Sequence, residues 1–141
     1  MPIGISAWFD EVLETRIRDL WRELAENEVS DDLHVGPYRP HVTLGVWNRA
    51  DVAKVHEIVA SIGRNAGLVP VRLTSVRLFD TPPSVVYLAP DSDRGLRSIK
   101  EQLHRLLQDH VTEPLPFQEL GDWVAHCTIA WKLTDPTKAL E

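Results

Sequence analysis

Apolar residues recur at the spacing of an amphipathic helix in three stretches of the chain, between residues 13 and 24, 52 and 62, and 96 and 107. Gly63 is expected to end the second of these helices. Other stretches are rich in apolar and β-branched residues and predict strands, namely Pro2–Trp8, Val42–Trp47, Val69–Phe79, Ser84–Leu88 and Trp123–Lys132.

The segments between these elements carry proline, glycine or aspartate and predict loops at Asp31–Pro40 and Glu113–Phe117. Asp80–Pro83 joins two predicted strands directly, which indicates an antiparallel hairpin. Helices and strands follow one another in a mixed order, and this order favours an α+β fold with antiparallel sheets.

Alternation along the last predicted strand separates two faces. Its apolar face carries Trp123, Ala125, Cys127, Ile129 and Trp131, which leaves His126, Thr128, Ala130 and Lys132 on the other face. In the strand Val42–Trp47 the same reasoning places Val42, Leu44 and Val46 on the apolar face, opposite His41, Thr43, Gly45 and Trp47. In both strands a histidine and a threonine therefore share the face that points away from the core.

These two faces carry one repeated motif of histidine, any residue, threonine and an aliphatic residue. It reads His41-Val42-Thr43-Leu44 in the first half of the chain and His126-Cys127-Thr128-Ile129 near its end. A single match would arise easily by chance, but both matches lie in strand-like segments and both precede a predicted helix start. The repetition predicts one structural unit used twice, in which a pair of imidazoles and a pair of hydroxyls would converge.

Composition narrows the classes of function. The chain has 141 residues, 43 % of them hydrophobic, and we expect residues 1–141 to form a single domain with its own core. A formal charge of −6 argues against binding along extended duplex nucleic acid, whereas a local anion site stays compatible with it. The single cysteine, Cys127, fits a reducing cytoplasm, and no segment reaches membrane-spanning length. We expect a cytoplasmic monomer without membrane contact.

The motifs resemble the signature of the 2H phosphoesterase superfamily, which includes 2′-5′ RNA ligase-like proteins and cyclic nucleotide phosphodiesterases. Pro40 precedes the first motif as in the family, whereas Ala125 stands where many relatives have proline. The resemblance implies a bilobal, pseudo-two-fold arrangement of two antiparallel sheets flanked by helices, with an active-site cleft between the lobes. The internal repeat predicts a further helix and strand after Leu140, so we expect a short member of the family or a truncated chain.

The resemblance further implies that His41 and His126 are the catalytic acid and base that open a 2′,3′-cyclic phosphate of a nucleotide or RNA end, since imidazoles titrate near neutrality. Thr43 and Thr128 would donate hydrogen bonds to the phosphate oxygens. This chemistry requires no metal and no cofactor. Tyr38, Arg39 and Lys132 are candidates for base stacking or phosphate binding, as is Trp47 on the same face as His41.

The remaining histidines and the cysteine have simpler interpretations. His56 is expected on a helix surface, His104 and His110 along the polar flank of the third helix, and His34 in a loop. Cys127 is expected in the core and not as a nucleophile.

The sequence leaves several functions open. Hydrolysis of a 2′,3′-cyclic phosphate is the first hypothesis, and 2′-5′ RNA ligation is the reverse of closely related chemistry. An ADP-ribose cyclic phosphate is a third candidate substrate. A nucleotide-binding module without turnover and a structural interaction domain remain as alternatives outside the enzyme class, and the sequence does not assign which histidine is the base.

Overall fold

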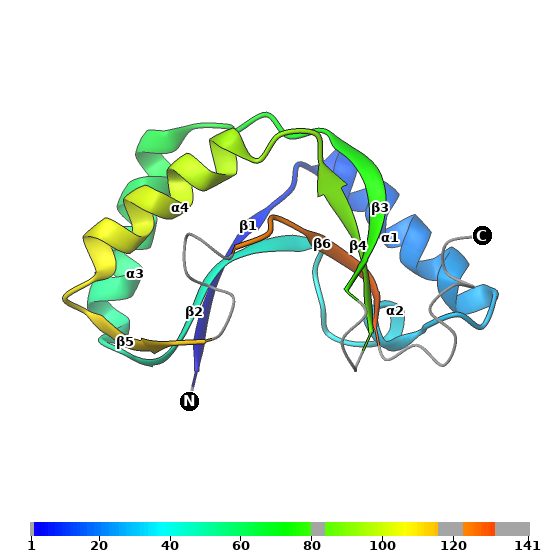
Figure 1. The fold of residues 1–141 in the computed structure, drawn as a ribbon, viewed down its shortest axis with the longest axis horizontal. Coiled ribbons are helices and arrows are strands. Elements are labelled where there is room, and N and C mark those ends of the chain that lie inside the picture. The colour runs from blue at the N-terminus through cyan, green and yellow to red at the C-terminus, as the bar shows by residue number, and fades with distance from the viewer. Residues whose placement is uncertain (1, 80–83, 116–122, 132–141) are drawn as a thin grey trace. The chain divides into compact units, whose positions relative to one another are not determined.

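The computed structural model describes residues 2–79, 84–115 and 123–131. The elements, in chain order, are β1 (Ile3–Trp8), α1 (Glu11–Glu26), α2 (Asp32–Val35), β2 (His41–Ala50), α3 (Val52–Ala66), β3 (Leu73–Phe79), β4 (Val85–Pro90), α4 (Arg94–Leu107), β5 (Val111–Pro114) and β6 (Cys127–Trp131) (Figure 1). They form two three-stranded sheets with flanking helices, so the predicted α+β class is confirmed. No helix in the described ranges is both long enough and apolar enough to span a membrane.

The chain divides into two compact units. The first unit comprises residues Met1–Ser6, Thr43–Arg72 and Asp91–Ala125, and the second comprises Ala7–Val42, Leu73–Pro90 and His126–Glu141. Each unit is thus assembled from three segments that are far apart in the sequence. His41 and His126, which are the first residues of the two predicted motifs, both belong to the second unit.

The first unit contains most of the sheet with strand order β1-β2-β5 and the helices α3 and α4, which pack against each other. Strand β2 pairs antiparallel with β5, from Trp47 opposite Pro114 to Ala50 opposite Val111. Helix α3 begins where the Asp51 side chain accepts a hydrogen bond from the Lys54 backbone N–H at 3.2 Å. It continues past Gly63 and ends at Gly67, whose φ of 64° is in the left-handed region that glycine tolerates. The prediction that Gly63 ends this helix was wrong.

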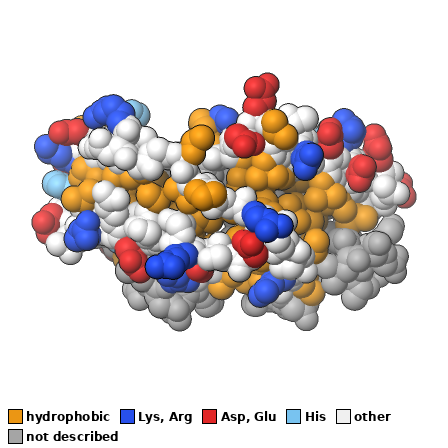
Figure 2. All heavy atoms as spheres, turned by 90° about the horizontal axis from the view of Figure 1, so that it is seen from above, with side chains coloured by type: hydrophobic (Ala, Val, Ile, Leu, Met, Phe, Trp, Pro, Cys, Tyr) orange, Lys and Arg blue, Asp and Glu red, His pale blue; other side chains and the backbone are white. Residues whose placement is uncertain are grey.

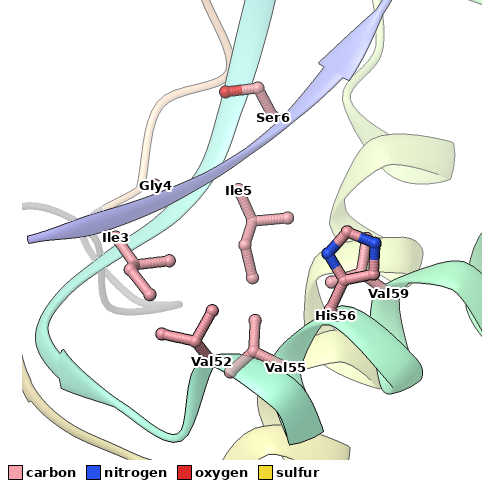
Figure 3. A pocket seen from close by; sticks show the side chains of 8 residues that line it. All are labelled: Ile3, Gly4, Ile5, Ser6, Val52, Val55, His56 and Val59. Carbon is pink, nitrogen blue, oxygen red and sulfur yellow. The ribbon is translucent and has the colours of Figure 1, made fainter.

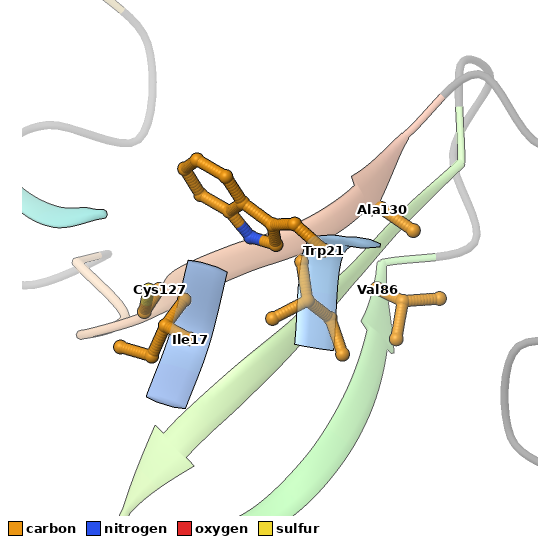
Figure 4. Close-up of a cluster of buried hydrophobic side chains, with 6 residues drawn as sticks. Ile17, Trp21, Val86, Cys127 and Ala130 are labelled. Atoms are coloured by element: carbon orange, nitrogen blue, oxygen red, sulfur yellow. The ribbon is translucent and has the colours of Figure 1, made fainter. Parts of the chain in front are cut away.

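The second unit contains the antiparallel sheet with strand order β3-β4-β6, and α1 and α2 pack against β6. Asp10 caps α1 by accepting a hydrogen bond from the Leu13 N–H at 2.8 Å. The apolar stripe of α1 packs on one face of the sheet in a cluster composed of Ile17, Trp21, Val86, Cys127, Ile129 and Ala130 (Figure 4). The predicted hairpin is confirmed by the β3–β4 pairing, and its turn at 80–83 lies outside the described residues.

An irregularity in β6 changes which of its residues face the core. Tyr87 lies opposite Thr128 and Val86 lies opposite Ala130, so Ile129 is an extra residue in β6, as in a β-bulge. Ala130, completely buried, therefore joins Val86 on the core side, and Trp131 lies opposite Val85. Simple alternation placed Trp131 on the core face and Ala130 on the other face. Both assignments were wrong, because a bulge shifts the alternation by one residue.

Other element boundaries differ from those predicted. The segment Asp31–Pro40 contains the short helix α2, and the predicted loop Glu113–Phe117 overlaps β5. Strand β2 extends to Ala50, and β6 begins only at Cys127, four residues after Trp123. Short elements such as β5 are specified by pairing with a distant strand, so local composition does not reveal them.

Truncation of Ile17 tests the importance of the α1 contact with the sheet. Ile17 is 2 % exposed within the cluster, so Ile17→Ala is expected to lower the free energy of unfolding by about 2–5 kcal/mol. Urea denaturation followed by circular dichroism measures the loss. Val12→Ala provides the matched control, because Val12 is 65 % exposed on the same helix and its truncation is expected to change stability by less than about 0.5 kcal/mol. Equal losses in the two variants would contradict the described packing of α1.

Candidate functional site

The first histidine of the repeated motif is held by the backbone that precedes it. His41 is the first residue of β2 and is half-buried, and its Nδ1 lies 2.7 Å from the backbone oxygen of Arg39. A carbonyl oxygen only accepts hydrogen bonds, so Nδ1 carries the hydrogen and donates it. In the neutral ring the lone pair therefore lies on Nε2, which makes Nε2 the atom of His41 that is able to take up a proton.

The second histidine is held among aromatic rings on one face of the β3-β4-β6 sheet. His126 immediately precedes β6, and its imidazole lies edge-on to Phe79 at 5.2 Å and to Tyr87 at 5.4 Å between ring centroids. Phe79 and Tyr87 stack on each other at 4.2 Å. Thr128 lies opposite Tyr87 in the β4–β6 ladder and therefore shares this face with His126.

The first residue of one motif and the cysteine of the other meet in the second unit. The His41 backbone forms a hydrogen bond to the Cys127 thiol, and Cys127 is the residue that follows His126. Cys127 is completely buried, and this burial raises its pKa to about 12, although the bond from His41 opposes the shift. The thiol therefore stays protonated and unreactive at neutral pH, as expected from the sequence. Its role is to fix the start of β2 against the start of β6.

The residues that follow His41 are held in the first unit by two side chains from elsewhere in the chain. The Trp123 indole Nε1 donates a hydrogen bond to the Thr43 backbone oxygen at 3.1 Å. The Lys100 ammonium donates to the Leu44 backbone oxygen, and His104 Nε2 lies 3.3 Å from the same oxygen. The backbone at the threonine and aliphatic positions of the first motif is thus bound by α4 and by Trp123.

Lys100 is completely buried, which is unusual for a lysine. Burial, with a smaller contribution from the charge of Arg97, lowers the pKa of Lys100 to about 8. Burial and the nearby Lys100 also lower the pKa of His104, against the opposing effect of its hydrogen bond to Leu44. His104, expected on or near the polar flank of the helix, has a half-buried ring that lies 5.0 Å from the Trp47 ring.

Sequence reasoning missed Lys100, although the helix carried a signal. The buried residues of α4 are Leu96, Lys100, Leu103 and Leu107, so the lysine occupies a position of the apolar stripe. The expectation that Trp47 is available to stack on a base is also wrong, although its ring lies on the face predicted for it. It is 4 % exposed, and its ring lies over Gly45, where a Cβ atom would come within 2.5 Å of it.

The three predicted substrate contacts, Tyr38, Arg39 and Lys132, have different surroundings or lie outside the described residues. The Arg39 Nε donates a hydrogen bond to Glu14 Oε1 at 2.6 Å, and its guanidinium lies 3.6 Å from the centre of the Trp8 ring. Tyr38 is 41 % exposed. Lys132 lies outside the described residues. Trp8, which sequence reasoning did not single out, is 64 % exposed beside Arg39.

A pocket of about 260 Å³ lies elsewhere, in the first unit between β1 and α3 (Figure 3). Ile3, Ile5, Val55 and Val59 supply apolar surface, and His56 is the single titratable residue in its lining. His56 is exposed on α3, as predicted. One imidazole among apolar side chains does not provide an acid and a base together, so the candidate site remains the pair of histidine motifs.

Over residues 2–79, 84–115 and 123–131, no group of three or more His, Cys, Asp and Glu side chains is arranged to hold a metal ion.

The family profile described as the 2′-5′ RNA ligase superfamily matches residues 49–141, about two thirds of the chain. The matched range contains the second motif, His126–Ile129, and begins after the first motif, His41–Leu44. No curated protein and no solved structure matches the chain. The match agrees with the resemblance to the 2H phosphoesterase superfamily noted from both motifs.

The pKa of Lys100 predicts a specific dependence of stability on pH. The folded state releases this proton near pH 8, whereas the unfolded chain holds it to about 10.5, so unfolding takes up a proton between these values and stability rises with pH across that range. Relative to Lys100→Met, the wild type is expected to gain up to roughly 3 kcal/mol in free energy of unfolding from pH 8 to 10.5. Urea denaturation at a series of pH values measures this difference.

A matched control is Lys54→Met, because the Lys54 side chain is 53 % exposed on α3. The stability difference between the wild type and this variant is expected to change little over the same pH range. If the stability difference between the wild type and Lys100→Met is also independent of pH, burial does not depress the pKa of Lys100.

Proposed function

The chain belongs to the 2′-5′ RNA ligase superfamily, and on this basis we propose that it is a metal-independent phosphoesterase that hydrolyses 2′,3′-cyclic phosphates of nucleotides or RNA ends. The observation that supports the proposal is that both histidines belong to the second unit, where the His41 backbone bonds to Cys127, the neighbour of His126. We propose that the two imidazoles, which come from distant parts of the sequence, act on one substrate.

Hydrolysis of a cyclic phosphate needs one group to take a proton from the attacking water and another to give a proton to the leaving ribose oxygen. Histidine is suited to both tasks near neutral pH, one ring acting neutral and the other protonated. The His41 Nδ1 is committed to the Arg39 carbonyl, so its Nε2 would exchange the proton. The aromatic rings around His126 restrict its imidazole and reduce the cost of orienting it for the reaction.

Thr43 and Thr128 are proposed as donors to the non-bridging phosphate oxygens. Each threonine follows its histidine by two positions on a strand, so both side chains of a motif project from one face. Hydroxyl donors fixed on a strand stabilise the charge that develops on the phosphoryl oxygens without having to reorganise. Both threonines are half-buried, which leaves part of each side chain accessible.

The outer contacts belong to the same proposal. Tyr38, exposed three residues before His41, is suited to stacking on a base. Arg39 would bind phosphate only by exchanging Glu14 as its partner, because the carboxylate holds the guanidinium in the free protein. Lys132 is proposed as a further phosphate contact on the strength of its place in the sequence.

Ligation of RNA through a 2′-5′ bond is the second candidate, because it is the activity in the description of the matching family. Ligation runs related chemistry in reverse, with the two histidines exchanging acid and base roles. The same site would accept an ADP-ribose cyclic phosphate as an alternative substrate of the same chemical class.

Replacement of the two histidines tests the proposal. Wild-type protein is expected to hydrolyse a 2′,3′-cyclic mononucleotide, or a short RNA that ends in this group, in the presence of EDTA. His41→Ala and His126→Ala are each expected to lower kcat by at least about 10²- to 10⁴-fold, and the double variant by little more, because the two residues act as one unit. Separation of the 2′- and 3′-phosphate products measures the rate and identifies the bond that is broken.

His56→Ala serves as the control, since His56 is exposed on α3 in the first unit and is expected to leave the rate unchanged. If the wild-type protein binds the cyclic nucleotide without converting it, the hydrolase hypothesis is contradicted and a nucleotide-binding module is favoured. Joining of RNA ends without hydrolysis would favour ligation.

A further inference from the structure

A cationic residue that the motifs do not include lies on the His126 face of the β3-β4-β6 sheet. In the strand ladders Arg77 of β3 lies opposite Tyr87 of β4, and Tyr87 lies opposite Thr128 of β6. These three residues form one row across the sheet. Neighbouring strands are about 4.8 Å apart, so the backbones of Arg77 and Thr128 are separated by about 10 Å.

Ring contacts identify the face from which Arg77 projects. Phe79 is two residues after Arg77 in the regular part of β3, so both side chains project from the same face. The Phe79 ring contacts the rings of Tyr87 and His126. Arg77 therefore belongs to the face that carries His126 and Thr128, opposite the face on which α1 packs.

The side chain of Arg77 is available for a ligand. It is exposed, and its Nε donates a hydrogen bond to Ser75 Oγ at 3.4 Å. Within the described part of the chain, no carboxylate forms an ion pair with Arg77, whereas Arg39 in the same unit is paired with Glu14.

We propose that Arg77 binds a phosphate group of the substrate on the His126 face of this sheet. A guanidinium offers two parallel N–H donors that match phosphate oxygens, and it keeps its charge at every pH of interest. Arg77 would supply the positive charge that the neutral threonine hydroxyls lack. This inference rests on the proposed function for the identity of the ligand, and it adds a specificity residue outside both motifs.

Arg77→Gln and Arg77→Lys test the inference on two substrates, a 2′,3′-cyclic mononucleotide and a short RNA ending in the cyclic phosphate. The glutamine variant is expected to lower kcat/KM by about 10- to 100-fold on at least the RNA, because a hydrogen bond to a charged group is lost. The lysine variant is expected to recover part of the loss, since it keeps the charge without the paired donors. Equal losses on both substrates would assign Arg77 to the reacting phosphate, and a loss confined to RNA would assign it to a neighbouring phosphate.

Arg16→Gln is the matched control, because it removes the same charge from an exposed position on α1, the helix that packs on the other face of the sheet. If Arg77→Gln and Arg16→Gln both match the wild type on both substrates, the inference is overturned while the proposed function stands. If the wild type converts neither substrate, the proposed function fails, and binding of adenosine 2′-monophosphate tests the role of Arg77 separately. Weaker binding by Arg77→Gln than by Arg16→Gln then supports the inference. Equal binding by these two variants would overturn it.

Discussion

The contact between the His41 backbone and the Cys127 thiol is the constraint on which the candidate site depends. It joins the start of β2 to the start of β6, two strands that belong to different sheets. Cys127 is itself fixed in a completely buried position by Ile17, Trp21 and Val86. The start of β2 is therefore anchored to the hydrophobic core through the residue that follows His126. A core of this kind is rigid, which suits the positional accuracy that a pair of acid and base groups requires.

Polar contacts also hold the backbone around the two motifs in place. Backbone oxygens at Arg39, Thr43 and Leu44 accept hydrogen bonds from His41, Trp123 and Lys100, and the Thr128 backbone oxygen accepts one from Trp21. Buried carbonyl groups need such partners, and here side chains supply them next to the catalytic candidates. The burial of Lys100 costs stability at neutral pH, and in return the backbone of the first motif gains a donor that few other residues could provide at that depth.

The sequence was sufficient for the features that depend on local pattern. The α+β class, three of the helices and the β3–β4 hairpin follow from periodicity and turn residues, and the two histidine motifs follow from their repetition. The remaining features depend on pairing between distant segments. The bulge at Ile129, which moves Ala130 into the core, is defined only by the register with β4. Arg77 acquires its significance from two ladders that place it in line with Thr128, and no local signal distinguishes it from other exposed arginines.

The central claim is that His41 and His126 act together as a base and an acid. The most direct measurement is the dependence of kcat/KM on pH for a 2′,3′-cyclic mononucleotide, from about pH 5 to 9. The account predicts a bell-shaped profile, because activity requires one imidazole neutral and the other protonated, and each limb reports one of these groups in the free enzyme. A rate that changes in only one direction, or that does not depend on pH across this range, would contradict catalysis by the paired histidines.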